Sequence, residues 1–148
     1  MTNNKLNLLI ENAIIWAKSQ IGSIDYCTKC LAFVEDSLER SNNIEIFGGD
    51  TAKESAELYE AYKKTSIPPK GAFVFYDCFG EIGGVSKNWG HVGLACDNGE
   101  IIHAWDKVRI DDYIGVEKLN SAPGWTQPRF IGWVPIERVL KEVKDRIW

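Results

Sequence analysis

The sequence is poor in three features on which common functions depend: histidine, excess basic charge and long apolar runs. Histidine occurs twice among 148 residues, at His91 and His103, so any imidazole chemistry has to use these side chains. The formal net charge is −4, which provides no basic surface for nucleic acid and argues against a nucleic-acid partner. A bilayer-spanning helix needs ~18 consecutive apolar residues, and the sequence contains no such run.

The sequence also lacks the marks of a secreted domain held together by disulfides. Its four cysteines have no regular spacing, and a chain of this length with 45% hydrophobic residues can bury a core without cross-links. At the N-terminus no basic region precedes a continuous apolar run, because Asn7, Glu11 and Asn12 interrupt it. We therefore expect reduced thiols, no signal peptide, no membrane span, and a protein made soluble in the cytoplasm.

Hydrophobic periodicity divides the chain into a helical first half and a strand-rich second half. Apolar residues at 6, 9, 10, 13, 14 and 17 form the stripe of an amphipathic helix that ends near Gly22. Thr28 is predicted to cap a second helix over 28–40, and Asp50 or Thr51 a third that runs to Tyr62. β-Prone runs follow at 72–77, 91–97, 100–106, 107–110 and 130–134, with a glycine-rich loop at 78–90 and a C-terminal helix at 136–147. This order predicts one α+β domain over residues 1–148.

The segment that contains both histidines is predicted to form a β-hairpin around the loop at 97–99. A two-residue loop would place the histidines on opposite faces. A three-residue loop, commonly a type I turn followed by a left-handed residue such as Gly99, places His103 opposite Gly93 with His91 as its diagonal neighbour. We favour this register because it also gathers apolar side chains on the other face. These are Val92, Leu94, Cys96, Ile102 and Ala104.

Cys30 lies near the start of the second predicted helix. Free amide groups and the helix dipole at such a position stabilise a thiolate and lower the thiol pKa, and the same amides can bind an oxyanion. One hairpin histidine could act as the base, while the second orients it by accepting its other ring proton. A buried structural cysteine and two hydrogen-bonded histidines are the alternative interpretation.

Cys27 and Cys30 also form a C-x-x-C pair, which is found in thioredoxin-like redox sites and in half of a zinc site. A redox site would have a strand directly before the pair, and helix and loop are predicted there instead. A zinc site would have a second close pair, and Cys78 and Cys96 are far apart in sequence. We assign no role to Cys78.

Together the motifs KCLAFVEDSL, P-x-G-AFVFY, GHVGL…NGEIIHAWD and IGWV resemble the NlpC-type cell-wall cysteine peptidases, which are papain-like and related to CHAP-type amidohydrolases. The resemblance runs from Tyr26 to Val134. It implies Cys30 as the nucleophile, His91 as the general base and His103 as the third polar residue. It also implies that Tyr26 lines the site. Trp89 and Trp105 are further candidates for contacts with the substrate.

The chain departs from the family's pattern around the nucleophile, and the order of its site residues bears on which branch of the family it resembles. The family usually has Asp-Cys-Ser-Gly around its nucleophile, whereas this chain has Lys29-Cys30-Leu31-Ala32. The resemblance therefore does not determine the shape of the cleft. The order Cys, His, His argues against the permuted lipid acyltransferase branch, in which the histidine comes first.

The sequence therefore predicts an α+β, papain-like fold in which N-terminal helices pack on a small antiparallel sheet. The expected reaction is hydrolysis of an amide bond through a thioester. The resemblance implies a peptidoglycan stem peptide as substrate, cut by an endopeptidase or amidase that needs no metal or organic cofactor. Such an enzyme would reach the wall only after release or export, and a cytoplasmic amide or isopeptide is the alternative substrate. Two alternatives stay open: a redox protein that uses Cys27 and Cys30, or an inactive binding module of the same fold.

Overall fold

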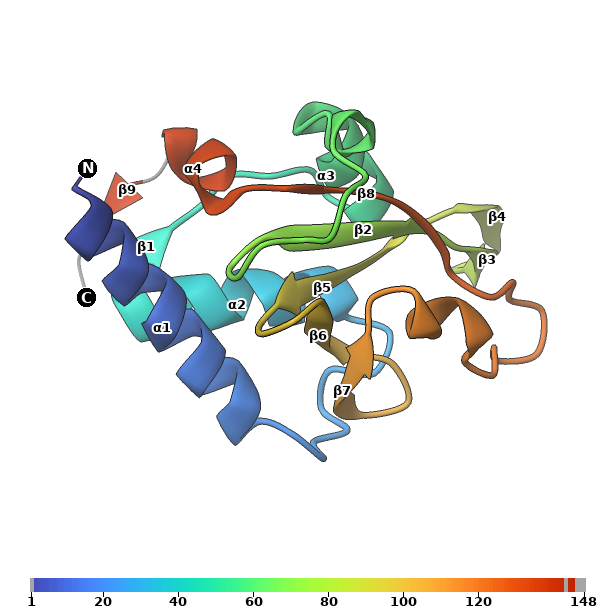
Figure 1. Ribbon diagram of the computed structural model, residues 1–148. Helices are drawn as coiled ribbons and strands as arrows, with labels where there is room; N and C mark the ends of the chain where they lie inside the picture. The colour runs from blue at the N-terminus through green and yellow to red at the C-terminus, as the bar shows by residue number, and fades with distance from the viewer. Residues whose placement is uncertain (1, 143, 146–148) are drawn as a thin grey trace.

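The computed structural model describes residues 2–142, 144 and 145, and its fold is α+β, as predicted (Figure 1). Most of the helical residues come before the strands of the main sheet. The helices are α1 (Asn3–Ser19), α2 (Cys30–Asn42), α3 (Ala52–Leu58) and α4 (Ile136–Val139), with 3-10 turns η1 (Ala61–Lys63), η2 (Gly115–Lys118) and η3 (Leu140–Glu142).

The main sheet has five strands in the order β7-β6-β5-β2-β8, and all neighbouring pairs are antiparallel. Its strands are β2 (Phe73–Asp77), β5 (His91–Ala95), β6 (Glu100–Ala104), β7 (Val108–Asp112) and β8 (Arg129–Val134). Two small strand pairs lie outside it. They join β1 (Ile44–Glu45) to β9 (Lys144–Asp145), and β3 (Phe79–Ile82) to β4 (Val85–Asn88).

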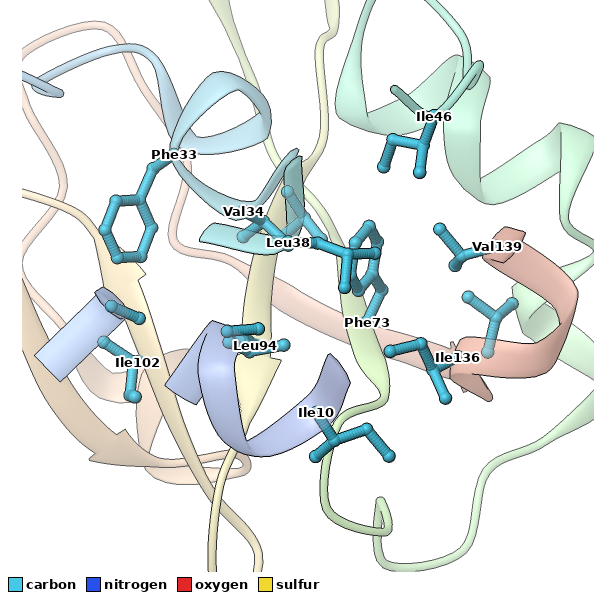
Figure 2. Packing of buried hydrophobic residues seen from close by; sticks show 14 of the residues in the cluster. Ile10, Phe33, Val34, Leu38, Ile46, Phe73, Leu94, Ile102, Ile136 and Val139 are labelled. Atoms are coloured by element: carbon cyan, nitrogen blue, oxygen red, sulfur yellow. The ribbon is translucent and has the colours of Figure 1, made fainter. Parts of the chain in front are cut away.

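The N-terminal helices cover one face of the sheet and form the main core with it. The predicted stripe of α1 is buried, and α2 packs both on α1 and on strands β5 and β6. Figure 2 shows side chains from α1, α2, the strands and α4 meeting in this core. The predicted packing of N-terminal helices on a small antiparallel sheet is therefore confirmed.

The opposite face of the sheet carries a second, smaller apolar cluster, which the chain around η2 and Phe130 covers. The members of this cluster are Ala72, Val74, Tyr76, Ala95, Ile101 and Val116. Side chains alternate along a strand, so His91 lies on this face with Ala95, and His103 lies here with Ile101. Both histidines thus lie on the side of the sheet away from α1 and α2.

The β5–β6 hairpin has the predicted register. Leu94 pairs with Ile102, and the amide of Cys96 donates to the carbonyl of Glu100 at 2.9 Å, so residues 97–99 form the loop. The turn itself differs from the expected type I conformation. Asn98 and Gly99 both have positive φ, and the amide of Glu100 donates back to Asp97, a pattern typical of a type I′ turn. Asn and Gly tolerate this conformation better than other residues.

Helix boundaries show two corrections. Thr28 is not an N-cap, because its φ is +65° and α2 begins at Cys30, with Lys29 at the capping position and no side-chain cap. The third predicted helix starts as expected, since the Thr51 hydroxyl accepts from the amide of Glu54, but it ends at Leu58 rather than Tyr62. The chain turns there through Glu60, whose φ is +57°.

The predicted loop at 78–90 is instead the β3–β4 hairpin, which turns at Gly83 and Gly84, both with positive φ. Its strands are short and mostly exposed, so they carry little hydrophobic periodicity. The predicted C-terminal helix is shorter than expected, because α4 ends at Val139 and is followed by η3 and β9. Its predicted positions 143, 146 and 147 lie outside the described residues.

Candidate active site

A cavity of about 740 Å³ lies where the start of α2 meets the start of β5 and the chain after β6. Cys30, His91, Trp89 and Trp105 all line it, so the structure brings together four of the six residues predicted for the site. Residues far apart in sequence complete the walls. They include Glu35, Asp50, Thr51, Cys78, Ile82, Asn120 and Trp125.

Cys30 is the first residue of α2 and is half-buried. Burial raises the pKa of its thiol from 9.0 to about 11, although the backbone amides of Val92, Leu31 and Cys30 itself act in the opposite direction. The predicted lowering of this pKa by the helix N-terminus is therefore wrong. The amides are present, but the cost of charging a buried sulfur outweighs them.

His91 is the first residue of β5 and is 3% exposed. The glycine before it lets the chain approach α3 closely, because a Cβ at Gly90 would lie 2.5 Å from the amide nitrogen of Lys53. Gly90 also has a φ of +76°, which other residues rarely adopt. Two rings flank the imidazole: Trp105 meets it in a T-shaped arrangement at a centroid distance of 5.2 Å, and Tyr76 is tilted against it at 5.8 Å.

The two histidines touch each other, as the favoured hairpin register predicts. Nε2 of His91 lies 2.8 Å from Nδ1 of His103. Gly93 provides the room, because a Cβ there would lie 3.2 Å from Cβ of His103 and 2.5 Å from Cδ1 of Ile101. Burial lowers the pKa of His103, and burial and its neighbour together lower that of His91 well below 6.5. Both imidazoles are therefore neutral at pH 7.

Asp111 and Arg109 extend this contact, and the sequence analysis missed them. Nε2 of His103 lies 2.7 Å from Oδ2 of Asp111, and Arg109 donates to the same oxygen from Nε at 2.8 Å. Burial alone would raise the pKa of Asp111, but hydrogen bonds from His103 and Arg109 lower it overall. The alternation of Val108 and Ile110 with these polar residues is the sequence signal for them, but a strand predicted to end at 110 does not include Asp111, whereas β7 extends to Asp112.

Three tryptophans form much of the apolar wall. The indole N–H of Trp89 donates to the carbonyl of Gly80 at 3.0 Å, and that of Trp105 donates to Asn120 at 2.9 Å. Trp125, which the sequence analysis did not select, lies directly against Gly80, where any Cβ would overlap its ring. Hydrogen bonds and close packing thus hold the aromatic surface of the cavity in place.

Tyr26 lies elsewhere. Its hydroxyl donates to Asp36 at 2.7 Å, and its ring packs on Trp16 and Phe33. Among the described residues that line the cavity, Tyr26 does not occur. The structure therefore does not bring it to the other predicted site residues.

The surroundings of Cys27 differ from those of Cys30. The thiol of Cys27 donates to the carbonyl of Asp106 at 2.9 Å, and Cys27 is not among the described lining residues. Residues 20–29 form turns and irregular chain, so the strand that a redox C-x-x-C site would have before it is absent there. Cys78, for which the sequence predicts no role, lines the cavity and is buried.

The charged side chains around the cavity are mainly acidic. Glu35, Asp50 and Asp106 line it, against a single lining cation, Lys29, within the described part of the chain. Glu35 is half-buried on α2, and burial, with smaller effects of Glu39 and Asp36, raises its pKa to about 7. The cavity therefore favours neutral or cationic groups.

Within residues 2–142, 144 and 145, no cluster of three or more His, Cys, Asp or Glu side chains is arranged to hold a metal ion. Nor does any helix in this described part have the length and apolar character to cross a membrane.

No protein-family model matches the sequence, and no curated protein matches it. Among solved structures, the chain is similar to the peptidoglycan hydrolase RipB from Mycobacterium tuberculosis. The two share 18% sequence identity at a TM-score of 0.49, and the match covers 88% of this chain and 67% of that chain. A function for this chain thus has to be inferred from its own side chains.

Proposed function

We propose that this protein is a papain-like cysteine hydrolase of the NlpC type, with residues 1–148 as one catalytic domain. Cys30 is the nucleophile, His91 the general base and His103 the residue that orients His91. One observation carries the proposal: Cys30, at the start of a helix, lines the same cavity as His91, whose Nε2 is occupied by His103. That contact leaves Nδ1 as the ring nitrogen available for the thiol proton.

The reaction starts from a neutral thiol and a neutral imidazole, because burial disfavours the charged form of both groups. As Sγ of Cys30 bonds to the amide carbonyl carbon, its proton passes to Nδ1 of His91. The electron pair of the C=O bond moves to oxygen, and the amides at the start of α2 donate hydrogen bonds to this oxyanion. The helix dipole stabilises the same negative charge.

Collapse of the tetrahedral intermediate breaks the C–N bond and leaves a thioester on Cys30. The imidazolium of His91 gives its proton to the departing amine. Water then attacks the thioester carbon and transfers a proton to His91, and the C–S bond breaks. The carboxylic acid leaves, and His91 returns the proton to the sulfur. The cycle balances without a metal or an organic cofactor.

The substrate we propose is a peptidoglycan stem peptide, cut as by an endopeptidase or amidase. The motifs shared with NlpC-type peptidases support this class. The cavity is compatible with it, because its tryptophan wall offers Trp89 and Trp105 for packing against a peptide or sugar, and its acidic side chains favour an amine. Action on the wall would follow release or export of the protein.

The experiment is digestion of purified peptidoglycan with wild type, Cys30→Ala and Cys27→Ser, with products identified by mass spectrometry. The wild type and Cys27→Ser should release the same peptide fragments, and Cys30→Ala should release none. Cys27→Ser is the matched control because Cys27 lies three residues away, outside the described cavity lining. Equal loss in both variants would contradict the proposal and favour redox chemistry, and fragments released by Cys30→Ala would contradict it outright.

A further inference from the structure

We propose that Asp111, held by Arg109, is a positioning residue that fixes the protons of both histidines so that Nδ1 of His91 is a proton acceptor. The kinetic part of this inference rests on the proposed function. The structural part concerns only where the protons reside on His91 and His103.

Strand pairing brings the four residues together. His103 lies opposite Arg109 in the β6–β7 ladder, and Asp111 lies two residues further along β7 on the same face. Oδ2 of Asp111 is 2.7 Å from Nε2 of His103 and 2.8 Å from Nε of Arg109. The guanidinium also reaches Oδ1 of Asp111 from a terminal nitrogen at 3.3 Å. Arg109 thus contacts the carboxylate on its exposed side, and His103 contacts it on its buried side.

Arg109 also contacts a second carboxylate, that of Asp106. A terminal nitrogen of Arg109 donates to Oδ1 of Asp106 at 3.2 Å, and Asp106 lines the cavity. Arg109 therefore joins two carboxylates, one behind the histidines and one at the cavity wall. A planar guanidinium with several donors in fixed directions suits this role better than a lysine would.

The location of each proton follows from Asp111. A carboxylate can only accept hydrogen bonds, so Nε2 of His103 must carry the proton in the 2.7 Å contact. Because His103 is neutral, its Nδ1 is bare and accepts from His91, whose Nε2 therefore carries a proton. His91 is neutral as well, so its Nδ1 is bare. One half-buried carboxylate thus determines the tautomers of two rings.

A merely structural ion pair between Arg109 and Asp111 would not have this effect. Such a pair would hold β7 in place but would leave His103 free to adopt either tautomer. The two roles differ in what happens when the carboxylate is removed. Without it, Nε2 of His103 loses its acceptor, both rings exchange between tautomers, and Nδ1 of His91 is protonated for part of the time.

The direct test is ¹⁵N NMR of the imidazoles in the wild-type protein at pH 7.5. Two histidines give four ring-nitrogen signals, which makes the assignment simple. Both Nε2 atoms should be protonated and both Nδ1 atoms bare. A wild type in which either ring carries its proton on Nδ1 would overturn the inference. This measurement needs neither substrate nor a variant, so it stands apart from the proposed hydrolase activity.

The second test compares Asp111→Ala with Asp112→Ala. Asp112 is the next residue of β7, is exposed, and accepts from the amides of Ile114 and Gly115, so it is the matched control on the same strand. Asp111→Ala should show Nδ1-protonated imidazole, and its kcat should fall ~10–100-fold with little change in KM, a part of the ~10²–10⁴-fold that general-base catalysis contributes. Asp112→Ala should keep both wild-type tautomers and kcat.

The outcomes separate the two proposals. Wild-type tautomers and unchanged kcat in Asp111→Ala would overturn the positioning role while leaving the hydrolase proposal intact. An inactive wild type with Nε2-protonated histidines would overturn the hydrolase proposal but not the assignment of protons. If Asp111→Ala fails to fold, the wild-type spectrum alone decides.

Discussion

Nε2 of His91 and Nδ1 of His103 lie 2.8 Å apart, and this contact determines which nitrogen of His91 is available for chemistry. His103→Leu should therefore reduce kcat by roughly 10²-fold, because the ring of His91 loses its acceptor and can rotate or change tautomer. His103→Asn keeps an acceptor oxygen and should lose less, about 10-fold. Steady-state kinetics on peptidoglycan fragments checks this order, and equal activity of His103→Leu and wild type would contradict it.

The space beside the histidines depends on Gly93. Gly93→Ala should destabilise the fold by about 1–3 kcal/mol, the usual cost of overpacking, because the new Cβ would meet Ile101 at 2.5 Å and His103 at 3.2 Å. The displaced imidazole should also lower kcat. Gly115→Ala is the control, since its Cβ would be in ordinary contact with Asp112 at 3.4 Å. Urea unfolding measures both variants, and an equal effect of the two would count against this account of Gly93.

Glu35 should make stability depend on pH. Burial raises its pKa from 4.5 to about 7, so between these values the folded state binds more protons than the unfolded state and stability falls as pH rises. Glu35→Gln removes this cost and should be more stable than wild type by about 1–3 kcal/mol at pH 8. The difference should vanish below about pH 4.5.

The control for this prediction is Glu81→Gln on the exposed part of β3, which should leave the pH dependence unchanged. Urea unfolding at pH 4.5, 6 and 8 measures the three proteins. A Glu35→Gln protein whose stability follows the wild type at every pH would show that burial of this carboxyl has no energetic consequence.

The pH dependence of activity should show that the resting site is neutral. The pKa of His91 lies well below 6.5 and that of Cys30 is about 11, both because of burial. The value of kcat/KM should therefore rise with increasing pH in a range well below pH 6.5, as His91 loses its proton. Above that range it should stay level into the alkaline region. Repeating the profile with Glu35→Gln removes the titration of Glu35, whose pKa is about 7, from this range. A preformed thiolate–imidazolium pair would instead lose activity as the imidazolium deprotonates, so an alkaline limb below ~8.5, the ordinary thiol pKa, would contradict the neutral site.

Much of the site was predictable from the hairpin. The Asp97-Asn98-Gly99 loop and the apolar alternation of β5 and β6 fix the register, and the register places His91 beside His103. The register can be predicted from this pattern because one face of the hairpin is buried, and a slip by one residue would expose its apolar side chains. The N-terminal helices were predictable because each buries an apolar stripe at helical spacing.

Other features were not predictable, because they depend on contacts between distant segments. Asp111 matters through a partner on the neighbouring strand, and Trp125 through its packing on Gly80. The pKa of Cys30 reverses the local expectation, since the helix start is visible in sequence whereas the burial of the sulfur is not. The β3–β4 hairpin is largely exposed and so leaves little hydrophobic pattern.

The central claim is that Cys30 forms a thioester with the substrate after His91 removes its proton. The most direct measurement is mass spectrometry of enzyme quenched in acid during turnover of peptidoglycan fragments, followed by peptide mapping. A hydroxylamine-sensitive adduct on the peptide that contains Cys30, absent from His91→Ala, is the predicted result. Product formed without any adduct on Cys30, at a rate that Cys30→Ala does not change, would contradict the account.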